Sequence, residues 1–246
     1  MTKKDKILAN RIYLILAALF IASLVTSNLI FQKFFYWYPF NLEVSGVKLF
    51  EVSVGLLPYP LTFLITDILS EIYGQKKAND VVIAGIFASF FSLLIIFISQ
   101  NAPATEWSPI NNETFTKVFG AAPLAVLASM LAYLFAQFID IRIYHFWKKL
   151  TKGKHLWLRN NFSTFSSQFI DTITVLVLLC SFGIINWNNF LGLLLSGVIF
   201  KIMVAALDTP ILYLFVYAFR KRFNLEIDQE IDDDAILGFN TELEKR

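Results

Sequence analysis

The chain has 246 residues, of which 57% are hydrophobic and only 16% are charged, and it contains 26 phenylalanines. A soluble domain of this length is usually about 45–50% apolar with about a quarter of its residues charged, so one globular core cannot bury this excess. The composition excludes a soluble enzyme, a disordered regulator and a nucleic-acid binder. It predicts an all-α integral membrane protein that crosses the lipid bilayer several times and does not bind nucleic acid.

The net charge of +2 is unevenly distributed along the chain. Residues 1–222 carry a formal charge of +8, whereas residues 223–246 carry −6, with three consecutive aspartates at 232–234. A basic body fits loops that face an anionic cytoplasmic leaflet, and the acidic end is typical of a solvated extension. We therefore expect a transmembrane domain over residues 1–222 and an acidic cytoplasmic tail over residues 223–246.

A transmembrane helix needs about 20 mostly apolar residues. Six segments meet this requirement: residues 12–31, 54–73, 81–99, 123–147, 163–185 and 190–219. The apolar run of the first segment exceeds the roughly 7–15 residues of a cleavable signal, so we expect this helix to be retained. Three spans in each half allow a 3+3 inverted repeat, in which a binding site lies near the bilayer midplane between the halves.

The basic residues predict the orientation of these six helices. Seventeen Lys and Arg residues fall on one side of the membrane, and only Lys33, Lys48 and Lys117 fall on the other, while Lys201 lies within a span. By the positive-inside rule, both termini are cytoplasmic. Residues 41–52 alternate around Ser45-Gly46 and predict a short extracytoplasmic hairpin after the first helix. The polar residues 100–120 are expected to lie along the outer surface.

Polar residues share one face of the second predicted span. Thr62, Thr66 and Ser70 are four residues apart, with Asp67 and Glu71 beside them. An ionisable residue inside a span normally faces the protein interior or water, and it marks a candidate functional site. Asp67 is the deeper of the two acids. Glu71, close to the cytoplasmic end, is also explained by solvation or ion pairing.

The fifth predicted span carries the longest polar stripe. It comprises Asn161, Thr164, Gln168 and Asp171, with Asn160, Ser167 and Thr174 beside it. At 1.5 Å per residue, Asp171 lies about 15 Å from the start of the stripe, close to the midplane. This deep carboxylate is the strongest indication of a binding site in the sequence.

The fourth and sixth predicted spans add further ionisable groups. Gln137 and Asp140 share one face of the fourth span, where Arg142 offers an alternative role as the partner of Asp140. In the sixth span, Lys201 and Asp208 are seven residues apart. Mutual neutralisation is an alternative for this pair, although about 10 Å of axial separation is long for direct contact.

Together, these groups suit a small polar solute with several N–H donors better than a bare ion. A carboxylate accepts two parallel N–H bonds, an Asn or Gln amide both donates and accepts, and aromatic side chains can stack on a planar ring. The sequence has no Walker A motif and no His-Glu-x-x-His motif. We expect a transporter for a planar heterocycle, without catalytic residues, metal or cofactor, and a homo-oligomer is compatible with this prediction.

Four stretches of the chain, in the same order, resemble the queuosine precursor transporter family, which is also called the vitamin uptake transporter family. They are residues 59–77 (YPLTFLITDILSEIYGQKK), residues 137–140 (QFID), residues 160–172 (NNFSTFSSQFIDT), and residues 200–201 (FK) with residues 209–213 (TPILY). The resemblance covers all six predicted spans, over residues 12–222, and excludes the acidic tail. It implies a multi-pass bacterial inner-membrane importer of 7-deazaguanine bases, such as 7-cyano-7-deazaguanine, for salvage into tRNA queuosine.

The resemblance also implies which residues bind the substrate. The positions that match the family pattern are Asp67, Gln137, Asp140, Gln168, Asp171 and Lys201, and Asn161 joins them through its place in the polar stripe. The supporting polar residues are Thr62, Thr66, Asn160, Thr164, Ser167 and Asp208, of which Asp208 lies outside the family pattern. Two alternatives remain open: a substrate-binding membrane subunit of an importer driven by a separate ATPase, and a membrane enzyme that modifies a lipid or heterocycle.

Overall fold

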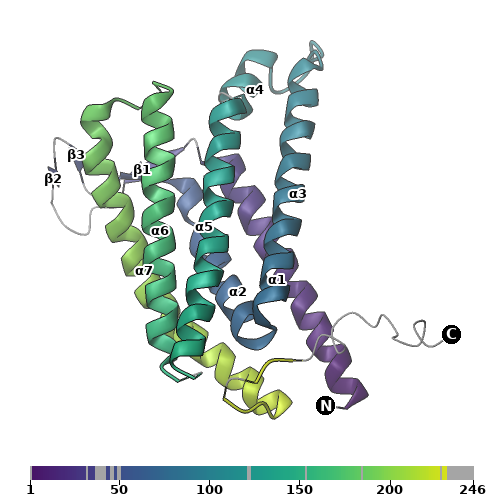
Figure 1. The fold of residues 1–246 in the computed structure, drawn as a ribbon. Coiled ribbons are helices and arrows are strands. Elements are labelled where there is room, and N and C mark those ends of the chain that lie inside the picture. Colours follow the sequence, from purple (N-terminus) through teal and green to yellow (C-terminus); the bar gives the residue numbers. More distant parts are fainter. Residues whose placement is uncertain are drawn as a thin grey trace.

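The computed structural model describes residues 2–31, 33–36, 43–44, 47–48, 51–120, 123–152, 154–183, 185–227 and 229–231. Long helices make up most of this part of the chain and form a bundle (Figure 1). The elements are α1 (Lys3–Ile30), β1 (Phe34–Tyr36), β2 (Glu43–Val44), β3 (Val47–Lys48), β4 (Glu51–Ser53), η1 (Val54–Leu56), α2 (Tyr59–Ile72), α3 (Gly74–Asn101), α4 (Asn112–Phe119), α5 (Pro123–Leu150), α6 (Leu156–Ser181), η2 (Trp187–Asn189) and α7 (Phe190–Phe223).

Within the described residues, four helical segments are long and apolar enough to cross a membrane. They are Lys3–Ile30, Gly74–Asn101, Leu156–Ser181 and Trp187–Phe223. These segments agree with the mainly helical, multi-pass membrane protein expected from the composition.

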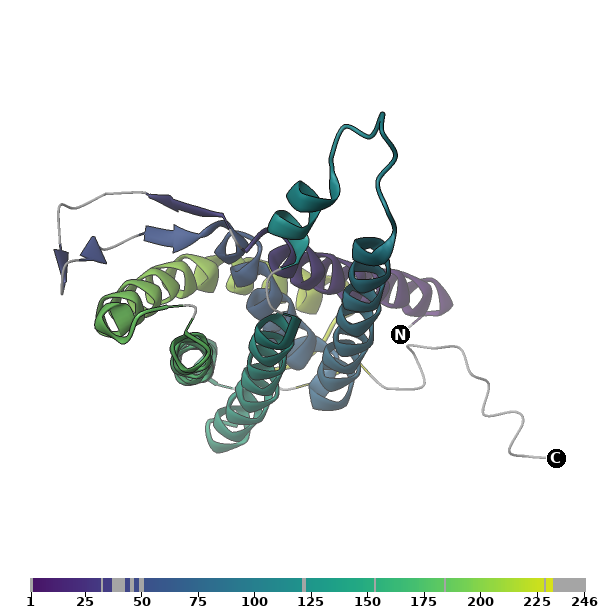
Figure 2. The ribbon, with the colours of Figure 1, turned by 90° about the horizontal axis from the view of Figure 1, so that it is seen from above.

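The short helix α2 lies inside the bundle. It packs against α1, α3, α5 and α7, and residues 62–74 are all buried (Figures 1 and 2). Its 14 residues are fewer than the 20 expected for residues 54–73, because the chain first makes the 3₁₀ turn η1 and the helix starts only after Pro58. Proline lacks an N–H and is tolerated in the first turn of a helix, which fits Pro60 at the start of α2. Since α2 is buried on all sides, its polar groups must find their partners within the protein.

The helix α6 begins earlier than expected. It starts at Leu156 instead of residue 163, and Arg159, Asn160 and Ser163 in its first turns are buried. Hydropathy alone places the start of a helix too late when the first turns carry polar groups that face other helices. This extension brings Arg159 into contact with α2 and α5, as described below.

Two small antiparallel strand pairs follow α1. Phe34 pairs with Ser53 in β1–β4, and Glu43 pairs with Lys48 in β2–β3. The β2–β3 pairing agrees with antiparallel strands in this segment, whereas the expected turn at Ser45-Gly46 lies outside the described part of the chain, as do residues 41–42 and 49–50. The polar connection at 100–120 contains α4, none of whose residues is buried.

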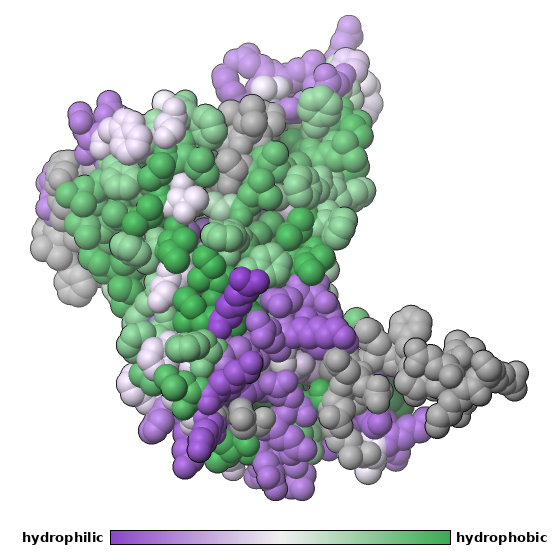
Figure 3. All heavy atoms as spheres, in the orientation of Figure 1, coloured by the Kyte–Doolittle hydropathy of each residue, from purple (hydrophilic) through white to green (hydrophobic). Residues whose placement is uncertain are grey.

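Much of the surface of the bundle is apolar. Figure 3 shows hydrophobic residues over most of the upper part of one face, with hydrophilic residues gathered at the lower end. On α3, Phe87 is 72% exposed, and Phe91 and Phe97 are also exposed. A large apolar patch is uncommon on a soluble monomer, and here it provides the surface that faces lipid.

At the end of the bundle where α1 begins and α7 ends, called the inner end below, the chain after α7 folds back onto α2 (Figure 1). The N–H of Ile231 donates to the carbonyl of Ile72 at 2.8 Å, and the Ile231 side chain is buried. The start of the acidic tail therefore packs on the bundle, whereas a solvated extension was expected. The aspartates at 232–234 lie outside the described residues.

Candidate functional site

Polar side chains from α2, α5, α6 and α7 meet in the interior of the bundle. On α2, α5 and α6 they recur at three- or four-residue intervals and therefore share one face, and α7 contributes Lys201. Because α5 packs along α6, α6 along α7, and α2 against both α5 and α7, these faces converge. We call this group the central cluster. It comprises Tyr59, Thr62, Thr66, Asp67, Tyr133, Gln137, Asp140, Thr164, Ser167, Gln168, Asp171, Thr172 and Lys201.

The deep carboxylate of Asp171 is bound by groups from two other helices. Lys201 Nζ on α7 donates to Asp171 Oδ2 at 2.7 Å and to the Thr172 hydroxyl at 3.0 Å. The Tyr59 hydroxyl at the start of α2 donates to the same Asp171 oxygen. The Lys201 ammonium also lies 4.5 Å from the centre of the Tyr59 ring. Asp171 is therefore held on one oxygen only, and the sequence alternative in which Lys201 neutralises Asp208 is wrong.

A second group joins α2 to α5 through hydroxyl and amide contacts. The Tyr133 hydroxyl donates to Thr62 Oγ1, and Gln137 Nε2 donates to the Tyr133 hydroxyl at 2.8 Å. Thr66 Oγ1 donates to Gln137 Oε1 at 3.2 Å. The Tyr133 ring packs against Tyr59, with 4.8 Å between ring centres. This network fixes the orientation of the Gln137 amide beside the aromatic wall of the cluster.

A carboxylate pair, Asp67 and Asp140, joins α2 to α5 one turn further toward the inner end. The two carboxyl groups lie within hydrogen-bonding distance of each other. Ser167 on α6 donates to Asp140 Oδ1 at 2.9 Å. Thr164 on α6 faces Asp67. The alternative in which Arg142 neutralises Asp140 is wrong, because Arg142 is exposed and forms no ion pair within the described residues.

Several buried acceptors of the central cluster remain without a partner. Asp67 Oδ1, Asp140 Oδ2 and Asp171 Oδ1 accept no hydrogen bond from the described residues. The side chain of Gln168 is also buried, and its amide forms no hydrogen bond to another described residue. Leaving a buried polar group unpaired costs about 1–3 kcal/mol, and more if the group is charged. The central cluster is therefore prepared to accept N–H or O–H donors from a bound molecule.

Three of the residues predicted from the sequence lie at the edge of the central cluster. Asn160 and Asn161 donate to the Thr209 hydroxyl on α7 at 3.4 and 3.3 Å, and Asn161 also donates to the carbonyl of Trp157. Asn161 is only partly buried, whereas Gln168 and Asp171 are buried. Asp208 on α7 is partly exposed and acts on Asp67 only through its charge.

The inner end of the bundle carries a different polar group, which we call the inner network. Glu71 is fully buried, and its Oε1 accepts from Arg159 at 2.5 Å and from Arg220. The Tyr144 hydroxyl donates to Glu71 Oε2 at 3.0 Å, and Lys148 Nζ lies 3.9 Å from the same oxygen. Of the two explanations given for Glu71, ion pairing is correct and solvation is wrong.

The inner network extends into the start of the acidic tail. Lys148 donates to Glu230 at 2.7 Å. Glu230 lies close to Gly74, where an added Cβ would clash with Glu230 Oε2. Gly74 also has a φ of 82°, which favours glycine and allows the sharp turn from α2 into α3. The network thus ties the inner ends of α2, α5, α6 and α7 together with the chain after α7.

Sequence reasoning did not identify Tyr59, Tyr133, Arg159 or Arg220 as members of these groups. Tyr59 precedes Thr62 by three residues, and Tyr133 precedes Gln137 by four, so helical spacing was an available signal. No comparable signal links Arg159 and Arg220 to Glu71, because the contacts span 88 and 149 residues.

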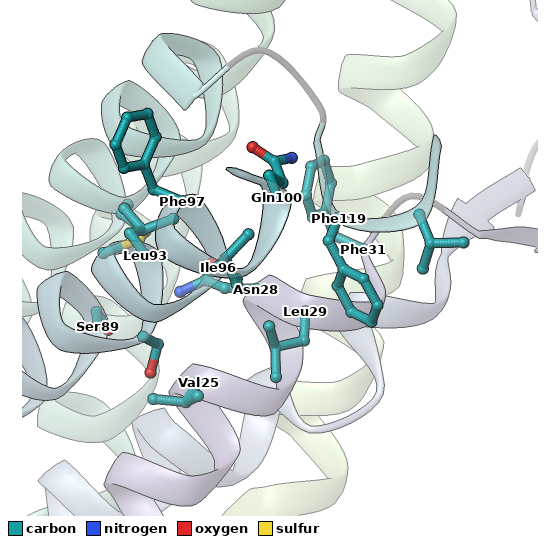
Figure 4. Close-up of a pocket in the computed structure, with 13 residues that line it drawn as sticks. Val25, Asn28, Leu29, Phe31, Ser89, Leu93, Ile96, Phe97, Gln100 and Phe119 are labelled. Atoms are coloured by element: carbon teal, nitrogen blue, oxygen red, sulfur yellow. The ribbon is translucent and has the colours of Figure 1, made fainter. Parts of the chain in front are cut away.

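The described residues also enclose a cavity between α1 and α3, near α4, of about 40 Å³. Figure 4 shows Asn28, Ser89 and Gln100 among mainly apolar side chains such as Leu29 and Phe97. No carboxylate lines it. This cavity is therefore separate from the central cluster, and its described lining lacks the carboxylate acceptors that distinguish the central cluster.

The comparisons with known proteins agree with the motifs in the sequence. The model of the family described as "putative vitamin uptake transporter" matches residues 53–215. A protein of Bacillus subtilis (strain 168), named "probable queuosine precursor transporter", is 30% identical over 177 residues, which cover 70% of this chain and 76% of that protein. No solved structure gives a significant match. The matched residues include the whole central cluster and, of the inner network, Glu71, Tyr144, Lys148 and Arg159. The chain therefore belongs to the vitamin uptake transporter family, also called the queuosine precursor transporter family.

Proposed function

We propose that this protein imports queuosine precursors, 7-deazaguanine bases such as 7-cyano-7-deazaguanine, across the bacterial inner membrane. The similarity to the Bacillus subtilis protein supports the substrate class. The observation that carries the proposal is the buried Asp171 carboxylate, which is bound by Lys201 and Tyr59 on Oδ2 while Oδ1 stays without a partner.

The chemistry of a guanine-like base fits this arrangement. Its ring N–H and exocyclic amino group lie side by side, and a carboxylate can accept both. Asp171 Oδ1 is available for one of these donors, and the other would compete with Tyr59 or Lys201 for Oδ2. Gln168 on the preceding turn can serve the ring carbonyl because its amide both donates and accepts. Tyr59 and Tyr133 form an aromatic wall beside Asp171, against which a planar ring can stack.

The same proposal includes the topology of the protein. We propose six spans with both termini in the cytoplasm and the 3+3 inverted repeat that this number of spans allows. The two described ends of the chain lie at the same end of the bundle in Figure 1, which an even number of spans requires. Lys148, Arg220 and their basic neighbours also lie at that end, as the positive-inside rule demands.

Complementation tests the proposed function directly. The chain is expressed in a strain that can neither make nor take up the precursor and that lacks any ATPase of a vitamin importer, and queuosine is measured in tRNA with each deazaguanine base supplied. We expect the wild type to restore queuosine and Asp171→Asn to abolish uptake, because the variant loses the charged acceptor, at about 1.5–3 kcal/mol, and also leaves the buried Lys201 ammonium without its partner.

Two controls keep this result interpretable. Asp80→Asn makes the same chemical change at an exposed position on α3 and should restore queuosine like the wild type. The double variant Asp171→Asn/Lys201→Met removes both charges, so it leaves no unpaired ammonium and should reach the membrane at normal levels while still failing to import. Normal import by Asp171→Asn, or no import of any deazaguanine by the wild type, would refute the proposal.

A further inference from the structure

The carboxylate pair of Asp67 and Asp140 has a charge that its surroundings do not balance. Asp67 is 3% exposed and Asp140 is fully buried, and one oxygen of each has no partner among the described residues. The Thr164 hydroxyl faces Asp67, is 3% exposed, and makes no hydrogen bond of regular geometry within the described chain. The two carboxyl groups thus form a preformed buried site, and the unsatisfied hydroxyl of Thr164 lies beside it.

Within the described residues, no ion pair joins Asp67 or Asp140 to a cation. Lys201 is held by Asp171, and Arg159 is held by Glu71. The groups that interact with the pair are Tyr133 and Tyr144 from α5, Asp208 from α7, and the hydroxyls of Ser163, Thr164 and Ser167 from α6. Asp208 adds negative charge, and the hydroxyls add none. Two adjacent carboxylates in a low-dielectric interior cannot both remain ionised, so the pair must bind a positive charge.

The geometry favours a proton over a metal ion. The carboxyl groups approach each other closely enough for one to donate a hydrogen bond to the other once a proton is bound. One shared proton satisfies an oxygen on each side by a short O–H···O⁻ bond, which is among the strong classes of hydrogen bond. In the residues that the structure describes, no group of three or more His, Cys, Asp or Glu side chains could hold a metal ion.

We propose that Asp67 and Asp140 form a proton-binding pair that couples import of the base to inward proton movement. The pair takes a proton from the outer side and releases it to the cytoplasm during each cycle, while the base binds at Asp171. The inference rests on the proposed function for its coupling step, whereas proton binding by the pair stands on the structure alone. In this proposal Asp67 and Asp140 bind a proton, whereas the sequence suggested that they bind the substrate.

Two measurements test the proposal with the full-length protein. The first is infrared spectroscopy of purified protein near neutral pH, where a protonated carboxyl group gives a C=O band that ionised surface carboxylates do not give. We expect this band in the wild type and in Asp80→Asn. Its position should shift in Asp67→Asn and in Asp140→Asn, and the band should disappear in the double variant Asp67→Asn/Asp140→Asn. Absence of the band from the wild type, or its persistence in the double variant, would overturn the proton-binding pair.

The second measurement is uptake of labelled 7-cyano-7-deazaguanine into proteoliposomes. With one proton per base, an inward gradient of about one pH unit supports about tenfold accumulation. We expect this dependence in the wild type and in Asp80→Asn, and a flat response to the pH gradient in both single Asn variants. Accumulation driven by a sodium gradient and not by a pH gradient would overturn the coupling. If the wild type cannot exchange labelled for unlabelled base in the absence of any gradient, the proposed function is refuted instead. The infrared measurement would still show whether Asp67 and Asp140 bind a proton.

Discussion

The central cluster and the inner network are built from the same four helices, yet their charges are balanced in opposite ways. In the inner network, Glu71 faces two arginines, a lysine and a tyrosine hydroxyl. In the central cluster, the three carboxylates Asp67, Asp140 and Asp171 face one ammonium group, that of Lys201. Asp67 and Glu71 are only one helical turn apart on α2. The role of a buried acid in this protein is therefore decided by the helix that faces it.

This difference separates stability from binding. A carboxylate that is fully paired holds helices together, and removing it leaves buried cations without a partner. A carboxylate with a free oxygen can exchange partners when a ligand arrives. Substitutions in the two regions should therefore affect different measurements, and three of them, in decreasing order of expected effect, test the comparison.

The largest effect is expected from Glu71→Gln. This change leaves the buried Arg159 and the partly exposed Arg220 beside a neutral amide, which should lower the stability by about 3–5 kcal/mol. The midpoint of thermal unfolding in detergent measures the loss. Glu113→Gln is the matched control, since its ion pair with Lys117 on α4 is exposed and should contribute nothing measurable. Equal unfolding midpoints for the two variants would contradict a structural role for the inner network.

An intermediate effect, on transport alone, is expected from Gln168→Leu. The Gln168 amide forms no side-chain hydrogen bond to the described residues, so its loss should leave the unfolding midpoint unchanged. If the amide binds the base, removing it should weaken binding by about 1–3 kcal/mol, which raises KM by about 5- to 150-fold. Thr174→Val on the same helix is the control, because the Thr174 hydroxyl bonds only to the backbone carbonyl of Ile170. An unchanged KM for Gln168→Leu would remove this residue from the binding site.

The smallest effect is expected from Arg142→Gln. Arg142 is exposed and is not the partner of Asp140, so neither the unfolding midpoint nor the rate of uptake should change. Parallel measurements on this variant and the wild type check the prediction. A loss of uptake comparable to that of Gln168→Leu would mean that Arg142 balances the carboxylate pair after all.

Helical spacing was sufficient to predict much of the central cluster. Thr62, Thr66 and Asp67 share the buried surface of α2, and Gln168 and Asp171 share one face of α6. The prediction was less accurate at the beginning of the fifth predicted span. Asn161, expected in the polar stripe, is turned toward Thr209, and residues 156–162, expected before the fifth span, already belong to α6. Hydropathy and spacing describe one helix at a time, so they cannot tell whether a polar residue faces lipid, water or another helix.

By itself, the sequence determined that this protein lies in a membrane, which polar residues share a helix face and, through its motifs, which family it resembles. The first two properties follow from composition and from the 3.6-residue period of the helix, and the resemblance rests on four motifs in the same order. Only the tertiary structure decided that Lys201 binds Asp171 instead of Asp208, that Glu71 is enclosed by Arg159 and Arg220, and that Asp67 meets Asp140. Those pairings depend on how helices far apart in the sequence pack together, and the periodicity of a single helix carries no information about them.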